Sequence, residues 1–179
     1  DLLSNLAENF IHHGFRRIVF LNGHGGNDVP GRQAVFELRQ THRSRKDLLL
    51  LFATYWLLNP GRGPDARYEQ QQMGHACEWE TSMMLRLSPH LVGDHRAVQP
   101  VASGNAFEPA SRRWVTQDRS EPGHIGSPHL ASAEKGEWLF QRFASDVEAL
   151  LQRAMTGKIP SLVALATELR LLGGEGTAY

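Results

Sequence analysis

The apolar residues of this chain follow two patterns, and the order of the patterns predicts an α/β fold. Residues 1–14, 27–42 and 130–156 repeat apolar side chains three and four positions apart, which is typical of helices with one buried face. Continuous apolar runs over Arg17–Leu21 and Asp47–Tyr55 are typical of strands covered on both faces. The order strand, helix, strand favours a right-handed crossover between parallel strands. We therefore predict a three-layer α/β/α arrangement with a mostly parallel sheet.

A further helix is predicted over Glu78–Ser88, and its apolar stripe is formed by Trp79, Met83 and Leu87. We expect this stripe to face the core and Glu80 to lie beside it, where a carboxylate is costly unless a cation or several donors meet it. Glu78 points nearly the opposite way, because consecutive helical residues turn by about 100°. Two structural interpretations stay open: capping electrostatics for Glu78, and a buried pair with an arginine or a backbone amide for Glu80.

The patterns divide the chain into one domain and a short addition. Gly157 and Pro160 interrupt the last long helical pattern, so we assign residues 1–157 to one α/β domain. Residues 158–179 are predicted to form an extra helix, Ser161–Leu172, followed by a loose tail. Leu57–Met73 is interpreted as either a substrate-covering loop or a plain surface connection. Asp94–Ser127 has little periodicity, and long segments of this kind are usually functional or mobile.

Composition narrows the classes of function. The 179 residues are 41% hydrophobic and 21% charged, which is ordinary for a globular domain with its own core. The 19 Lys and Arg residues balance 19 Asp and Glu residues, so the net charge of the chain does not indicate binding to nucleic acid or an acidic membrane. A single cysteine, Cys77, cannot form an internal disulfide, and we therefore expect a cytoplasmic location. Nine histidines favour metal chemistry.

The strongest chemical signal is a histidine on a glycine-rich turn. His24 follows the predicted strand directly, and Gly25 and Gly26 lead from it into the next helix. Ligands of α/β sheets bind at the carboxyl ends of strands, and glycines let the backbone approach a metal or substrate closely. The turn does not fit G-x-G-x-x-G and no Walker lysine follows, which disfavours a nucleotide. We assign substrate contacts to Asn22, Gly25, Gly26 and Asn27. A histidine that is merely solvated is the alternative for His24.

Three blocks, in this order, resemble the creatininase or creatinine amidohydrolase family of metal-dependent amide hydrolases. They are NGHGGN at residues 22–27, GHACEWETSMMLRL at Gly74–Leu87 and GHIGSPHLASAEKGE at Gly123–Glu137. The resemblance covers about residues 1–155. It implies hydrolysis of a C–N bond in a small cyclic amide or formamide, at a centre of two divalent ions (zinc, manganese or iron). It also implies a homo-oligomer.

The resemblance assigns roles to single residues. His24 matches the metal-ligand histidine of the family, and His75 matches its proton-transfer histidine. Creatininase has a glutamate ligand where this chain has Gly26, so we predict Glu78 as the replacement metal ligand. Glu80 is the second choice for that ligand and is otherwise assigned to catalysis or support. This exchange favours formamide- or peptide-cleaving branches over creatinine as substrate. Cys77 is interpreted as either a tolerated small residue or a thiol nucleophile.

One departure from the family bears on activity. Family members carry an upstream half with a Glu-x-His pair and an aspartate among the metal ligands, and this chain has no such segment. We therefore interpret the chain as the C-terminal two-thirds of the domain, and we expect weak metal binding and no amidase activity from it alone. A catalytically inactive fragment or a non-catalytic binding domain is the alternative function. A serine hydrolase is disfavoured because no G-x-S-x-G occurs. We expect His24, His75 and one of the two glutamates to converge on one pocket.

Overall fold

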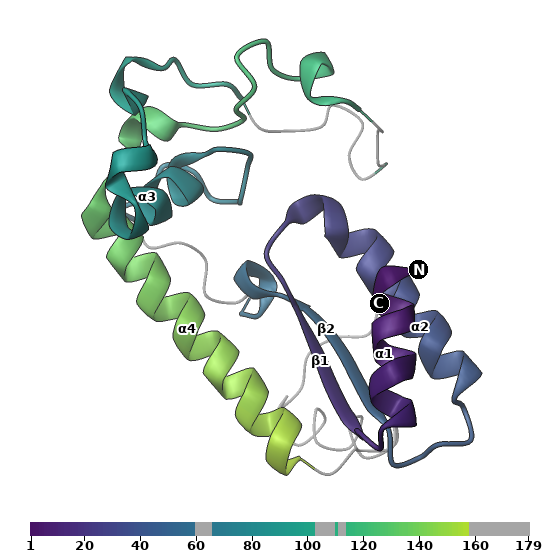
Figure 1. The fold of residues 1–179 in the computed structure, drawn as a ribbon. Coiled ribbons are helices and arrows are strands. Elements are labelled where there is room, and N and C mark those ends of the chain that lie inside the picture. Colours follow the sequence, from purple (N-terminus) through teal and green to yellow (C-terminus); the bar gives the residue numbers. More distant parts are fainter. Residues whose placement is uncertain (60–65, 103–109, 111–113, 158–179) are drawn as a thin grey trace, which may run out of the picture. The chain divides into compact units, whose positions relative to one another are not determined.

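The computed structural model describes residues 1–59, 66–102, 110 and 114–157 (Figure 1). It divides into two compact units, the first made of residues 1–55 with the end of the last helix from Val147, and the second of Trp56–Asp146. The α-helices and strands, in chain order, are α1 (Leu2–His12), β1 (Arg17–Asn22), α2 (Asp28–Thr41), β2 (Leu49–Thr54), α3 (Glu78–Leu87) and α4 (Ala133–Thr156). The predicted segments 158–179 lie outside the described residues.

The first unit is built on a parallel pair of strands. β1 and β2 lie side by side, with Arg17 opposite Leu49 at one end and Asn22 opposite Thr54 at the other (Figure 1). The predicted βαβ unit is therefore confirmed, because α2 connects the two strands. The register brings the carboxyl ends of both strands to one edge, where the His24 turn begins.

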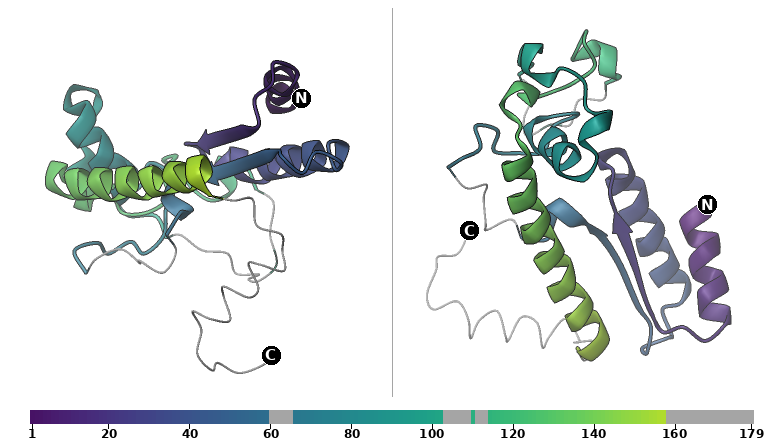
Figure 2. Two further views of the ribbon diagram at one scale, coloured as in Figure 1. Left: turned by 90° about the horizontal axis from the view of Figure 1, so that it is seen from below. Right: turned by 60° about the vertical axis from the view of Figure 1, so that its left-hand side comes forward.

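Helices α1 and α2 lie next to each other and supply the core of the first unit (Figure 2). The buried cluster draws on both helices, on β1 and on the residue before β2: Ala7, Ile11, Ile18, Leu38 and Leu48. Gly31 brings α2 close to β2, since a Cβ at this position would lie 2.1 Å from the Phe52 ring. The end of α4 lies on the other side of the strand pair (Figure 1). Arg17 donates a hydrogen bond to the Ala154 carbonyl there at 2.6 Å.

The second unit has an aromatic core between α3, α4 and the loop around Tyr68. Tyr68 packs edge-on against Trp79 with ring centroids 6.0 Å apart, and Trp79 packs against Phe143 at 6.2 Å. The indole of Trp79 also donates to the Gln70 carbonyl at 2.9 Å, so its polar atom is satisfied. This packing holds the start of α3 against the preceding loop.

The buried face of α3 differs from the predicted one. Glu78, Trp79 and Ser82 are the buried residues of the helix, whereas Met84 and Leu87 are exposed. The prediction placed Glu78 opposite the core and was wrong. The reason is that a cation from a distant part of the chain compensates the charge of this buried carboxylate. The ion pair is described below.

Gly136 is a point of close approach between α3 and α4. A Cβ there would lie 1.9 Å from the Ser82 carbonyl oxygen and 2.6 Å from its carbon. The backbones of α3 and α4 therefore lie in direct proximity at this position. Because the obstacle is main chain rather than a flexible side chain, it cannot move aside without separating the helices.

We expect Gly136→Ala to lower the free energy of unfolding by about 2 kcal/mol, the usual scale of overpacking in a core. The loss occurs even though alanine is the better helix former by about 1 kcal/mol. Urea unfolding measures it, with Ser145→Ala as the control because Ser145 is an exposed position of the same helix. Equal stability of the two variants would contradict the close approach.

No helix among the described residues is both long and apolar enough to cross a membrane.

Candidate functional site

The His24 turn is fixed by side chains at the ends of both strands. The buried Asn22 side chain accepts a hydrogen bond from the His24 backbone N–H at 3.1 Å and donates to its carbonyl at 2.9 Å. It also donates to the Thr54 hydroxyl at 2.9 Å, which in turn donates to Asp28 at 2.6 Å. These contacts join β1, β2 and α2, so the backbone at His24 is held while its side chain is exposed.

Glycine at position 26 leaves room for the imidazole. A Cβ on Gly26 would lie 3.0 Å from His24 Nε2 and 3.2 Å from Cδ2. The ring therefore rests over the glycine backbone, where a side chain at position 26 would crowd it.

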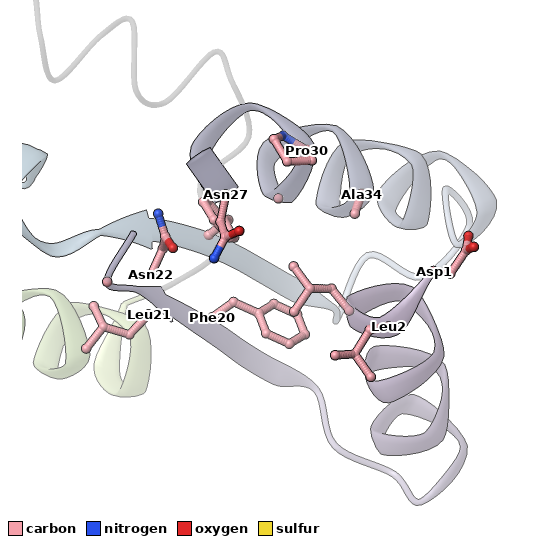
Figure 3. A pocket seen from close by; sticks show the side chains of 12 residues that line it. Asp1, Leu2, Phe20, Leu21, Asn22, Asn27, Pro30 and Ala34 are labelled. Carbon is pink, nitrogen blue, oxygen red and sulfur yellow. The ribbon is translucent and has the colours of Figure 1, made fainter. Parts of the chain in front are cut away.

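A cavity of about 460 Å³ adjoins this turn in the first unit (Figure 3). Its lining comes from α1, β1, α2 and β2, with Leu2, Phe20 and Pro30 around it. Of the predicted substrate-binding residues, Asn22 and Asn27 line this cavity. Gly25 and Gly26 are not among its lining residues.

Replacing Asn22 with alanine is expected to lower the free energy of unfolding by about 2 kcal/mol. The reason is that one backbone N–H, one carbonyl and the buried Thr54 hydroxyl each lose a partner. Denaturant unfolding tests this, and Asn9→Ala is the matched control because Asn9 is an exposed residue of α1. An effect no larger than that of the control would mean that Asn22 does not hold the turn.

The second and third sequence blocks meet at His75. The His75 N–H donates to the Ile125 carbonyl at 3.0 Å, and the Ile125 N–H donates back at 2.7 Å. The next residue, Ala76, has a φ of +46°, a left-handed conformation that costs a non-glycine residue about 1 kcal/mol. This local strain, next to an exposed histidine, is typical of a functional turn.

Glu78 is fully buried and already paired. Its carboxylate forms an ion pair with Lys135 of α4 and accepts a hydrogen bond from the Gln70 N–H at 3.1 Å. Lys135 also donates to the Leu130 carbonyl at 2.8 Å. Both charges are thus compensated, which is what a buried pair requires.

Glu80 is in a different state, because its Oε2 is buried and has no hydrogen-bond partner among the residues that the structure describes. The residue lines a cavity of about 380 Å³ in the second unit. A carboxylate oxygen that has lost water without gaining a donor is costly, so it is a candidate for binding something else.

Cys77 belongs to the packing of the second unit. Its side chain is 0% exposed, and its sulfur accepts from the Gly74 N–H at 3.4 Å. Burial raises the pKa of the Cys77 thiol, and the nearby Glu80 carboxylate also raises it. Since the thiolate is the nucleophile, these effects favour the small packing residue over a reactive thiol.

The predicted site residues fall in both units: His24 in the first, and His75, Glu78 and Glu80 in the second. Their convergence on one pocket stays a prediction. Within the described ranges, no group of three or more His, Cys, Asp or Glu side chains is placed to hold a metal ion.

Three polar residues near the second-unit site were not predicted. Lys135 pairs with Glu78, and Gln70 accepts from the Glu78 and Ser127 N–H groups. His95 lines the same cavity as Glu80. The Lys-Gly pair at the end of the third sequence block was a usable signal for Lys135, whereas Gln70 and His95 lie in segments without periodicity.

Comparison with known proteins gives consistent matches. The Creatininase family model, described as creatinine amidohydrolase, matches residues 1–151. The chain is 32% identical over 146 residues to the mycofactocin precursor peptide peptidase of Mycobacterium ulcerans (strain Agy99), covering 79% of this chain and 50% of that protein. It is 33% identical over 152 residues to the creatinine amidohydrolase of Pseudomonas putida, covering 79% and 55%. The chain thus spans about half the length of these curated relatives.

Solved structures agree with the fold. A manganese form of creatininase matches with a TM-score of 0.69 and 25% identity, over 88% of this chain and 63% of that chain. A mutant creatininase of the Zn-Zn type matches with a TM-score of 0.68 and 25% identity over the same shares.

Proposed function

We propose that this chain, which belongs to the creatininase (creatinine amidohydrolase) family, carries part of the active site of a metal-dependent amide hydrolase. The observation that carries the proposal is the state of two histidines in the family blocks. His24 and His75 are both exposed, while hydrogen bonds fix the backbone on which each is mounted. An exposed imidazole on a backbone held by hydrogen bonds is the arrangement expected of a histidine that binds or reacts, rather than of a mobile or purely structural one.

In this proposal His24 is a metal ligand. An exposed imidazole on a held turn at the carboxyl ends of two strands supplies the nitrogen donor that zinc and manganese sites commonly use. Divalent ions supply polarisation of an amide carbonyl when bound. The Zn-Zn and Mn forms of creatininase support this choice of ions. A complete centre needs further ligands in addition to His24.

His75 is the proposed proton-transfer group. Amide cleavage requires a proton at the leaving nitrogen, and a histidine is suited to deliver it near neutral pH. Of the two carboxylates beside it, Glu80 is the better candidate to act on a ligand. Glu78 is already neutralised by Lys135 and holds the Gln70 N–H, so use of it as a metal ligand would leave Lys135 without its partner.

The proposed substrate is a small amide of the formamide or peptide type. Gly26 stands in place of a ligand glutamate that the creatinine-cleaving enzyme carries, which argues against creatinine. The similarity to peptide peptidases of Mycobacterium supports a linear amide over a cyclic one.

Hydrolysis assays test this function. Short peptides, formamides and cyclic amides are offered with zinc or manganese to the 179-residue chain and to a version that also carries the sequence encoded before Asp1. We expect metal-dependent hydrolysis of linear amides by the longer version. Absence of hydrolysis of every substrate with every metal would overturn the proposal.

A further inference from the structure

The Glu80 cavity of the second unit has a lining whose chemistry extends beyond the role proposed above for Glu80 itself. Its polar lining includes two carboxylates, Glu80 and Asp94, and two histidines, His95 and His124. Lysine and arginine are absent from its lining residues. The lining therefore offers two carboxylates and no lysine or arginine beside them.

Two buried polar atoms of this lining lack partners within the described part of the chain. They are Glu80 Oε2 and His95 Nε2. They come from separate elements, α3 and the short turn His95–Ala97, so one local distortion does not explain both. By contrast, the ring of His124 is held, with Nε2 at 2.8 Å from the Gln99 carbonyl oxygen. Because a carbonyl only accepts, His124 Nε2 carries the proton and its Nδ1 is an acceptor when the ring is neutral.

The remaining walls are apolar and come from Met84, Leu91, Val92, Val98 and Pro128. A volume of about 380 Å³ lies within the range of small-molecule sites. The cavity thus combines hydrocarbon walls with acceptors and negative charge. A divalent ion does not fit this description, since among the described residues no three His, Cys, Asp or Glu side chains are placed to hold one.

We propose that this cavity binds an aliphatic ammonium group, with the alkyl chain against the apolar walls and the ammonium beside the Glu80 carboxylate. The cation supplies a donor to the Glu80 oxygen that has none among the described residues, and the two histidines are the further acceptors. The ammonium comes either from a free alkylamine or from a lysine side chain of a peptide. The second source rests on the proposed function, because it makes the cavity a side-chain subsite of an amide substrate.

Calorimetric titration of the 179-residue chain with n-butylammonium tests the site, with n-butanol as the neutral ligand of similar shape. We expect n-butylammonium to bind at least about tenfold more tightly, the scale of one hydrogen bond to a charged group. Salt should weaken the binding of the ammonium and not of the alcohol. Equal affinity for the two ligands, or no binding of either, would overturn the proposal.

Variants locate the site. Glu80→Gln keeps the shape of the side chain and is expected to weaken n-butylammonium binding about tenfold. Glu121→Gln, at an exposed glutamate outside the cavity, is its control and should leave the affinity unchanged. His95→Gln should also weaken binding, against His90→Gln at an exposed histidine. Circular dichroism verifies folding of each variant. If Glu80→Gln does not fold, the site is tested by two other results: the ratio of the affinities for n-butylammonium and n-butanol, and the comparison of His95→Gln with His90→Gln. An unchanged affinity for n-butylammonium in His95→Gln would then count against the site.

A third pair of ligands identifies the source. The ammonium comes from a lysine side chain of a peptide if N-acetyl-lysine methylamide binds at least as tightly as n-butylammonium. It must also bind more tightly than N-acetyl-norleucine methylamide, which lacks the ammonium. Binding of the free amine alone supports a small-molecule amine. These titrations need neither metal nor turnover. Binding of n-butylammonium by the 179-residue chain, together with absence of hydrolysis by the longer version, would therefore refute the proposed function and leave this site standing.

Discussion

Replacing Lys135 with methionine is expected to lower the free energy of unfolding by about 3 kcal/mol, among the largest effects of any single change to the described residues. The substitution leaves the Glu78 carboxylate, which is 0% exposed, without its cation in a closed environment. Loss of one partner from a buried ion pair typically costs about 3–5 kcal/mol. We expect the lower end, because the Lys135 side chain is 20% exposed and water can reach the vacated space.

Urea unfolding measures the effect, and two further variants make it specific. Lys46→Met changes the same residue type at an exposed position and should be nearly neutral. Glu78→Gln added to Lys135→Met should recover part of the lost stability, because the neutral amide still accepts from the Gln70 N–H. Additive losses in the double variant, or a Lys135→Met effect no larger than the control, would show that the pair contributes little.

The fold of the first unit could be predicted because its signals are local. Apolar runs marked both strands, and the glycine-rich turn marked the end of β1. The family and the creatininase-type α/β fold are confirmed as well. The start of β2 was placed two residues early, at Asp47 instead of Leu49. Asp47 instead binds Arg45 in the preceding turn at 2.9 Å, and this contact holds the pKa of the Asp47 carboxyl down to about 2.

The second unit was less predictable because its contacts join distant residues. Glu78 and Lys135 are 57 positions apart, so a helical wheel of α3 gave no reason to bury that glutamate. The cavity beside Glu80 depends likewise on His95, which lies in a segment without periodicity. Motif spacing identified the glutamates as candidates. Only the packing distinguished Glu78, which is paired with Lys135, from Glu80, whose Oε2 has no hydrogen-bond partner among the described residues.

Replacing His24 or His75 with alanine is expected to have different effects on metal content and activity in the longer version that carries the sequence encoded before Asp1. His24→Ala removes a proposed ligand, so metal content should fall to background and hydrolysis should be lost with it. His75→Ala removes the proposed proton donor and should lower kcat by about 10²–10⁴-fold while metal content stays unchanged. Elemental analysis and steady-state assays measure both quantities.

His13→Ala is the control for both variants, because His13 is an exposed histidine at the end of α1 outside the family blocks. It should retain metal and activity. Full metal content in His24→Ala would exclude His24 from the centre. Loss of metal from His75→Ala would make His75 a ligand instead of a proton donor, because removal of a group that only transfers a proton leaves the affinity for the ion intact. The separation of metal loss from kcat loss therefore decides which unit supplies ligands and which supplies the acid.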